Sequence, residues 1–224
     1  MTPPFDTSTA SASERSSRGA FITFEGVEGA GKSTQLDHLE KYLNAKGYDV
    51  LVTREPGGTQ LGEAIRSLLL DPGNAEMSAT AELFLYQAAR AQHVAELIRP
   101  ALEAGTVVLC DRFSDSTTAY QGAGRGVPLA DVARLHAMTT GGTSPALTVV
   151  IDVPAEVGLA RASQAGHPDR IERESVAFHE RVRAGFLQLA ELEPERVKVV
   201  NGNRPVDAVA AEVVALVDGL LGGA

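Results

Sequence analysis

The chain has 224 residues, a formal net charge of −9 and a single cysteine, Cys110. This length suits one sizeable domain, the acidic balance disfavours nucleic acid as a partner, and one cysteine excludes an intrachain disulfide. No run of 18 apolar residues occurs, so we expect no membrane-spanning segment. Residues 1–18 also lack the apolar core of a signal peptide, and we expect a cytoplasmic protein.

Residues 1–19 are rich in Ser, Thr and Ala and include two prolines. Such a composition has little apolar surface to bury, so we predict a disordered tail. From residue 20 onward the chain alternates β-favouring apolar runs with amphipathic runs and shows no further linker. We therefore predict one domain over residues 20–224.

The stretch FITFEGVEGAGKST, residues 21–34, has the spacing G-x-x-x-x-G-K-[ST] between a predicted strand and a predicted helix. This context is typical of a P-loop, in which backbone N–H groups and the start of the helix bind phosphates. Lys32 would then reach the β and γ phosphates, and the Ser33 hydroxyl would bind Mg²⁺. The alternative is a glycine-rich turn without a ligand. The predicted ATP-binding residues of this loop are Gly26, Val27, Glu28, Gly29, Ala30, Gly31, Lys32, Ser33 and Thr34.

The remaining elements follow in alternation. We predict strands at 20–24, 48–53, 106–110, 147–153 and 197–200, and helices at 33–46, 61–70, 79–104 with a break near Pro100, 114–121, 129–139, from 155, 174–192 and 206–221. Residues 122–126 are predicted to be a glycine-rich loop. Strands separated by helices imply an α/β fold, a five-stranded parallel sheet with helices on both faces.

Charged residues follow four of the five predicted strands, namely Lys32, Arg54, the pair Asp111-Arg112, and Asp152. Ligands collect at the carboxyl edge of such a sheet, and guanidinium groups there suit phosphates. Asp111 follows the apolar run 107–110, which is the Walker B pattern of a Mg²⁺ ligand. The alternative for Asp111 and Arg112 is an ion pair at the end of a strand.

Three motifs together resemble the thymidylate kinase family: the P-loop FEGVEGAGKST, TREPGG at 53–58, and DRFSDSTTAYQGAGRG at 111–126. The resemblance extends over residues 20–221. It implies a P-loop NTPase fold with a short lid, and transfer of a phosphoryl group from ATP to dTMP, giving dTDP for dTTP synthesis. It also implies Mg²⁺ as the cofactor, with ATP and dTMP as the ligands.

The resemblance implies roles for the residues of the acceptor site. Arg54 and Arg112 would hold the acceptor phosphate, and Glu28 would approach the sugar 3′-hydroxyl. Tyr86, where the family usually has Phe, would stack on thymine; the alternative is a core tyrosine. The remaining implied acceptor-site residues are Arg90, which bonds the base, Tyr120, which crowds the 2′ position, and Thr117 and Gln121, which line the base pocket.

The expected lid is RASQAGHPDRIE, residues 161–172, and it has fewer arginines than related lids. Catalysis would therefore rest on Lys32, Arg112 and the two lid cations, Arg161 and Arg170. Two other roles are open: Arg161 packing against adenine, and Arg170 pairing with Asp169 or Glu172. His167 is expected to be a solvated lid residue.

The loop 201–204, which includes Arg204, would lie beside the adenine of ATP or be a plain turn. The resemblance also implies a homodimer formed by long helices, although apolar helix faces are usually core. The expected mechanism is direct in-line transfer without a covalent intermediate. Two alternatives are a kinase of another nucleoside monophosphate and a P-loop switch that hydrolyses ATP slowly.

Overall fold

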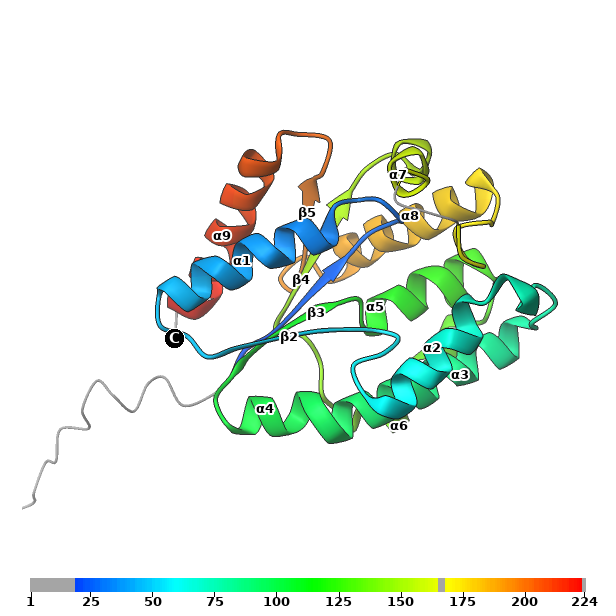
Figure 1. Ribbon diagram of the computed structural model, residues 1–224, viewed down its shortest axis with the longest axis horizontal. Helices are drawn as coiled ribbons and strands as arrows, with labels where there is room; N and C mark the ends of the chain where they lie inside the picture. Colours follow the sequence, from blue (N-terminus) through cyan, green and yellow to red (C-terminus); the bar gives the residue numbers. More distant parts are fainter. Residues whose placement is uncertain (1–18, 165–167, 223–224) are drawn as a thin grey trace, which may run out of the picture.

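The computed structural model describes residues 19–164 and 168–222. Its centre is one sheet of five parallel strands in the order β2-β3-β1-β4-β5 (Figure 1). The predicted fold class is thus confirmed. The strands are β1 (Phe21–Glu25), β2 (Val50–Arg54), β3 (Val107–Asp111), β4 (Leu147–Asp152) and β5 (Val197–Asn201).

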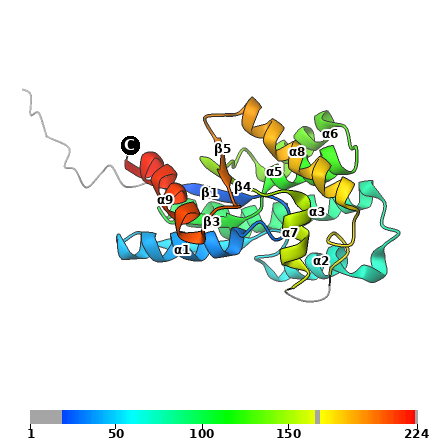
Figure 2. The same cartoon turned by 90° about the horizontal axis from the view of Figure 1, so that it is seen from above.

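Helices cover both faces of the sheet, as two perpendicular views show (Figures 1 and 2). The helices α1 and α9 pack side by side on one face, and α8 lies on the other. The α-helices are α1 (Lys32–Ala45), α2 (Gln60–Leu70), α3 (Ala79–His93), α4 (Arg99–Glu103), α5 (Ser114–Thr117), α6 (Leu129–Thr140), α7 (Ala155–Ala162), α8 (Val176–Leu192) and α9 (Val206–Gly222).

Two segments differ from the prediction because they are π-helical. The expected break near Pro100 is a π-helical turn, η3 (Val94–Ile98), through which α3 runs on into α4. Proline lacks an N–H group and crowds the preceding turn, so a wider turn before it keeps the helix continuous. The predicted loop at 122–126 is also partly helical, because the π-helix η4 (Thr118–Gly124) continues α5.

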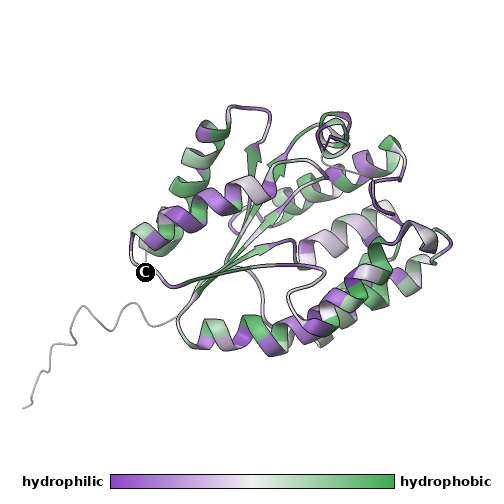
Figure 3. Cartoon of the chain, in the orientation of Figure 1, coloured by the Kyte–Doolittle hydropathy of each residue, from purple (hydrophilic) through white to green (hydrophobic). Residues whose placement is uncertain are grey.

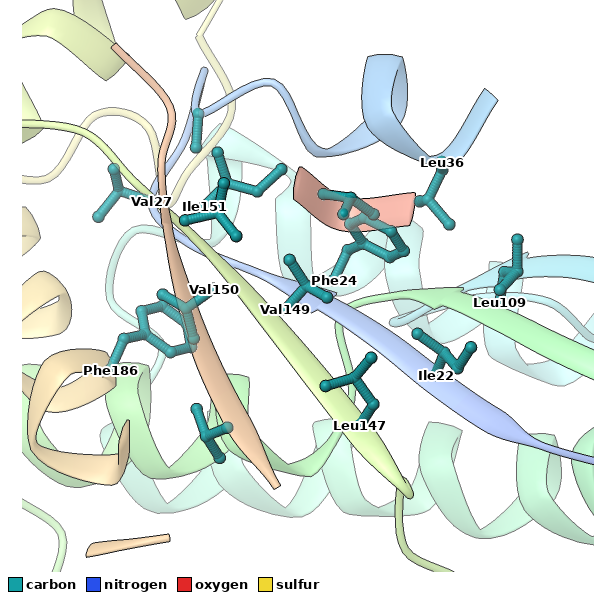
Figure 4. Packing of buried hydrophobic residues seen from close by; sticks show 14 of the residues in the cluster. Ile22, Phe24, Val27, Leu36, Leu109, Leu147, Val149, Val150, Ile151 and Phe186 are labelled. Carbon is teal, nitrogen blue, oxygen red and sulfur yellow. The ribbon is translucent and has the colours of Figure 1, made fainter. Parts of the chain in front are cut away.

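The core forms where alternate side chains of the central strands meet the helices. Ile22 and Phe24 of β1 pack with Leu36 of α1 and Val149 of β4 in one large apolar cluster (Figure 4). Phe21, on the opposite side of β1, belongs to a second cluster with η3 and β3. Figure 3 shows hydrophobic colour along the strands and along the inner sides of the helices. The free Cys110 thiol is buried in this second cluster.

No helix of residues 19–164 and 168–222 is long and apolar enough to cross a membrane. Residues 1–18 of the predicted tail at 1–19 lie outside the described residues, as do the predicted lid residues 165–167, with His167. At the end of β4, Asp152 is bound by Arg183 of α8, Nε to Oδ1 at 2.6 Å. Asp152 is therefore committed to an ion pair with α8.

Candidate active site

The loop between β1 and α1 has the backbone shape of a phosphate-binding loop. Gly26, Gly29 and Gly31 have φ values of 136°, 65° and 100°, which residues with a Cβ rarely adopt. The Lys32 ammonium donates hydrogen bonds to the backbone oxygens of Gly26 (3.3 Å) and Val27 (3.1 Å). Both its charge and the N-terminus of α1 therefore lie at one concave site suited to an anion. The predicted P-loop geometry is present.

Ser33 and Asp111 meet at the start of α1 and the end of β3. The Ser33 hydroxyl donates to Asp111 Oδ2 over 3.2 Å, while Asp111 Oδ1 is buried and has no hydrogen-bond partner in the described part of the chain. Within residues 19–164 and 168–222, no group of three or more His, Cys, Asp or Glu side chains is arranged to hold a metal ion by itself. Mg²⁺ typically takes one or two protein oxygens and completes its shell with phosphates and water. The donors present fit this ion.

Arg112 occupies a strained position directly after β3. Its φ is +71°, in the left-handed region where non-glycine residues are uncommon and often functional. Its guanidinium donates to Glu28 Oε1 (2.8 Å), to the Gly26 oxygen (2.9 Å) and to Ser116 Oγ (3.2 Å). The alternative of an Asp111–Arg112 ion pair is wrong, because Arg112 is paired with the P-loop instead.

Glu28 is held as a carboxylate by three neighbours. Burial opposes its ionisation, but Arg112, Lys32 and the Tyr120 hydroxyl, which donates over 2.9 Å, outweigh it and lower the pKa of Glu28 to about 2. This carboxylate is a hydrogen-bond acceptor at the mouth of the P-loop throughout the working pH range.

A pocket beside the P-loop brings together the predicted acceptor-site residues other than Arg54. Glu28 lies at one end of it. The other predicted residues in its lining are Tyr86, Arg90, Arg112, Thr117, Tyr120 and Gln121. They come from α3, η4 and the segments between, far apart in the sequence, so the motifs converge as expected.

Arg90 is fixed within the floor of this pocket. It donates from Nε to Glu55 Oε2 (2.8 Å), from Nη1 to Thr117 Oγ1 (2.9 Å) and from Nη2 to the Phe113 oxygen (2.9 Å). Its side chain is 1% exposed, and Glu55 is 4% exposed. A buried ion pair with this many hydrogen bonds is held in a single conformation. The Arg90 guanidinium is therefore already in place before a ligand enters the pocket.

A second pocket adjoins the first and contains the P-loop. Its lining includes residues 29–34, Arg54, Asp111 and Arg161. Arg54 is exposed there, and its Nη2 lies 3.1 Å from both carboxylate oxygens of Glu63. This pocket is called the donor pocket below, and the first is called the acceptor pocket.

Arg161 extends from the end of α7 toward the loop after β5. It donates to the Gly202 oxygen (3.3 Å) and to Asn203 Oδ1 (3.2 Å), and it lines both the donor pocket and a further hollow that includes Arg204. Arg204 itself is paired with Glu212. The loop 201–204 thus lies beside the P-loop.

Arg170, the other predicted lid cation, points elsewhere. It is 5% exposed, donates from Nε to the Leu69 oxygen (2.7 Å), and its Nη1 lies 2.6 Å from Glu82 Oε2. It lines neither the donor nor the acceptor pocket. The suggested pairing of Arg170 with Asp169 or Glu172 is wrong, since Glu82 of α3 takes that place.

Sequence reasoning missed two residues that the structure places in the site. Arg66 of α2 lines both pockets and donates from Nη1 to the Pro56 oxygen over 2.9 Å. It is the only basic residue of α2, and this isolated positive charge is the sequence feature that could have identified it as a site residue. Glu55, inside the TREPGG motif, binds Arg90 and also His93 Nδ1 (3.0 Å). The motif therefore also helps to hold Arg90 in the acceptor pocket.

Together, a five-stranded parallel sheet, a formed P-loop and an aspartate after β3 define a P-loop NTPase. Comparison with known proteins narrows this class. The family model for thymidylate kinase matches residues 24–213. The chain therefore belongs to the thymidylate kinase family, whose members phosphorylate dTMP to dTDP with ATP.

Individual relatives agree with this membership. The thymidylate kinase of Deinococcus radiodurans is 53% identical over 201 residues, covering 90% of this chain and 97% of that protein. The thymidylate kinase of Pseudomonas fluorescens is also 53% identical, covering 91% and 97%. The crystal structure of thymidylate kinase from Ehrlichia chaffeensis superimposes with a TM-score of 0.72 at 34% identity, covering 90% of this chain and 99% of that one.

Proposed function

We propose that this chain transfers the γ-phosphoryl group of ATP directly, in line, to the 5′-phosphate of dTMP. The observation that carries the proposal is that the donor and acceptor pockets share part of their lining, namely Glu28, Glu55, Arg66 and Arg112. Two phosphates bound in adjoining pockets can react without a covalent enzyme intermediate, because the acceptor oxygen is already a nucleophile. Positioning and charge neutralisation are then the main tasks of the protein.

On the donor side, the P-loop amides of residues 26–34 and the Lys32 ammonium would bind the ATP phosphates. Ser33 and Asp111 would hold Mg²⁺, which, when bound, neutralises charge on the β and γ phosphates. The buried Asp111 oxygen without a hydrogen-bond partner supports this assignment. Arg161 and Arg204 would lie beside the adenine and the phosphates.

On the acceptor side, Arg112 and Arg54 would bind the dTMP phosphate, because guanidinium groups make two parallel bonds to phosphate oxygens. Tyr86, Arg90, Thr117 and Gln121 would surround the base. Glu28 and Tyr120, which are hydrogen-bonded to each other, would face the sugar. Burial raises the pKa of Tyr86, so its ring stays neutral and suited to stacking.

Of the two predicted lid cations, Arg161 is the one that lines the donor pocket, and we assign it the phosphoryl-transfer charge. An arginine in this role is worth about 10³–10⁵ in rate in related phosphoryl-transfer enzymes. Arg170, the other predicted lid cation, is buried against Glu82 and the Leu69 oxygen instead.

The proposal includes a homodimer, with α3 and α6 as its contact surface. Phe84 on α3 is 56% exposed and Met138 on α6 is 79% exposed, and the two helices lie against each other. Light scattering on the purified protein would test this, with Phe84→Glu expected to give monomers. A cytoplasmic location is also part of the proposal.

The decisive experiment measures ADP release from ATP and Mg²⁺ with dTMP, dUMP, TMP, dCMP, dGMP and AMP offered separately. Strong stimulation by dTMP is the expected result. Stimulation by another monophosphate would favour a kinase of different specificity. ATP turnover that ignores every acceptor would favour a P-loop switch and would contradict the proposal.

A further inference from the structure

The carboxylate of Glu82, in the first turn of α3, is fully buried, accepts three hydrogen bonds from side-chain nitrogens and forms one further ion pair. Its Oε1 accepts from Gln121 Nε2 (2.8 Å) and Arg125 Nε (3.1 Å). Its Oε2 accepts from Arg125 Nη2 (3.0 Å) and pairs with Arg170 Nη1 (2.6 Å). One side chain thus joins α3, η4 and the segment that leads from the lid into α8.

The contact with Gln121 fixes the orientation of an amide in the acceptor pocket. A carboxylate only accepts hydrogen bonds, so the Gln121 nitrogen must face Glu82 and the amide oxygen must face away from it. Gln121 is 1% exposed and lines the acceptor pocket. Glu82 therefore determines which half of the amide a bound base would meet.

The contact with Arg170 fixes the opposite wall of the same pocket. Asp169 and Ile171, the two neighbours of Arg170 in the chain, both line the acceptor pocket. The Arg170 guanidinium is held by Glu82 and by the Leu69 oxygen at the end of α2. The backbone N–H of Arg170 donates to the Leu70 oxygen (3.0 Å). Residues 169–171, at the end of the expected lid, are thereby attached to α2 and α3.

Glu82, Glu174, Arg125 and Arg170 form one cluster in which the formal charges balance. Arg125 also binds Glu174 Oε1 (2.6 Å), so two carboxylates face two guanidinium groups in a largely buried place. Removing one member leaves an uncompensated buried charge, which makes the members respond together. Such a cluster can transmit a change in Arg170 to Gln121 through Glu82.

We propose that Glu82 is a positioning residue for dTMP binding, which holds Gln121 on one side of the acceptor pocket and Arg170 on the other. Arg170 is then an anchor of residues 169–171 and does not supply charge to the transferring phosphoryl group. This inference rests on the acceptor pocket proposed above.

The test compares Arg170→Met, Glu82→Gln and their combination by steady-state kinetics, and by calorimetric binding of dTMP in the absence of ATP. Each single variant is expected to weaken dTMP binding on the order of tenfold, with kcat at saturating substrates within about threefold of the parent. The combination is expected to be no worse than Glu82→Gln alone. Arg170→Lys, which keeps a donor for Glu82, is expected to recover most of the affinity.

A phosphoryl-transfer role for Arg170 predicts the reverse: kcat lower by about 10³ or more and dTMP binding unchanged. That result overturns the inference, as does additivity of the two substitutions. A purely structural role would lower the folded fraction without changing the dTMP dissociation constant, and would also overturn it. Glu103→Gln, on an exposed glutamate at the end of α4, serves as the matched control.

Gln121→Met separates failure of this inference from failure of the acceptor pocket. It is expected to weaken dTMP binding directly. If Gln121→Met weakens binding and neither Arg170→Met nor Glu82→Gln does, the positioning role is wrong and the pocket stands. If Gln121→Met leaves dTMP binding unchanged, both the pocket assignment and the inference that rests on it are wrong. Should Glu82→Gln fail to fold, the two Arg170 variants and Gln121→Met still decide the question.

Discussion

Arg112 and Glu28 are bound to each other where the two pockets meet, Nη2 to Oε1 at 2.8 Å. Both belong to the proposed acceptor site, so an arriving phosphate must share the Arg112 guanidinium with Glu28. The second terminal nitrogen of Arg112, Nη1, donates to the Gly26 oxygen and to Ser116 Oγ. These two bonds keep the guanidinium in place when a phosphate replaces Glu28 as a partner of Nη2. Preorganisation of this kind favours phosphate binding because little side-chain freedom is lost.

Arg112→Lys should therefore reduce kcat/KM for dTMP strongly. Lysine offers a compact point charge that cannot reproduce the planar fork, and loss of one or two charge-assisted bonds corresponds to about 10–100-fold. KM for ATP should change little. Steady-state kinetics with each substrate varied provide the measurement, and Arg134→Lys, on the exposed surface of α6, is the control. A rise in KM for ATP with unchanged dTMP parameters would contradict the role given to Arg112.

Glu25→Gln should change how stability depends on pH. Burial, together with the nearby Asp115 carboxylate, raises the pKa of Glu25 from 4.5 to about 7. The folded protein then holds this proton more tightly than the unfolded chain, so stability is full below pH 4.5 and falls as pH rises toward 7. The total loss is about 3.5 kcal/mol for a rise of 2.5 pKa units at ~1.4 kcal/mol per unit, and about 2–3 kcal/mol of it falls between pH 5 and pH 8.

The glutamine variant cannot ionise, so its stability relative to the parent should improve by this amount between pH 5 and pH 8. Denaturant unfolding at both pH values measures the effect. The hydrogen bonds from the backbone N–H groups of Phe113 (2.8 Å) and Ser116 (3.2 Å) can be kept by the amide oxygen. Parallel pH profiles for the two proteins would show that Glu25 does not titrate in this window.

Local patterns in the sequence were enough to predict the sheet and most of the helices. Apolar runs such as 107–110 predict buried parallel strands, and β3 is found at Val107–Asp111. The P-loop was also predictable, because its glycines and Lys32 act through backbone geometry that neighbouring residues determine. Boundaries shifted by one or two residues, since helix and strand ends depend on packing as well as on propensity.

Contacts between distant charged residues were not predictable. The sequence predicts that Arg170 supplies charge from the lid or pairs with a neighbour in sequence, whereas it pairs with Glu82, 88 positions earlier in the chain. Nothing local distinguishes an arginine that reaches a buried carboxylate from one that faces solvent. The π-helical turn before Pro100 was missed for a similar reason, because its stability depends on packing of Val94 and Ile98 against β3.

Asp111→Asn should raise the Mg²⁺ concentration needed for half-maximal turnover by about 10–100-fold. The substitution removes the negative charge of the Asp111 carboxylate, which accepts a hydrogen bond from Ser33, and leaves the volume of the side chain nearly unchanged. Binding of dTMP measured without metal should stay as in the parent. Asp131→Asn, on the surface of α6, is the control and should titrate with Mg²⁺ like the parent. An unchanged Mg²⁺ dependence for Asp111→Asn would remove Asp111 from the metal site.

Gly158→Ala should impair ATP binding although Gly158 belongs to no motif. Gly158 lies in α7, and a Cβ there would be 2.2 Å from the Glu28 backbone oxygen; in turn, a Cβ on Gly29 would be 2.0 Å from the Gly158 oxygen. The P-loop backbone and the α7 backbone therefore lie in direct contact at this point. A methyl group must push the loop away, and misplacement by about 1 Å can cost on the order of 10² in rate.

The matched control is Gly219→Ala in α9, where an added Cβ would meet nothing within 4 Å. That substitution should stabilise the protein by about 0.5–1 kcal/mol through helix propensity and leave kinetics unchanged. Gly158→Ala gains the same propensity, so a rise in KM for ATP or a fall in kcat would come from the contact with the P-loop. If both variants behaved alike in ATP titrations and thermal unfolding, α7 would not support the P-loop, and its tight packing would have no part in nucleotide binding.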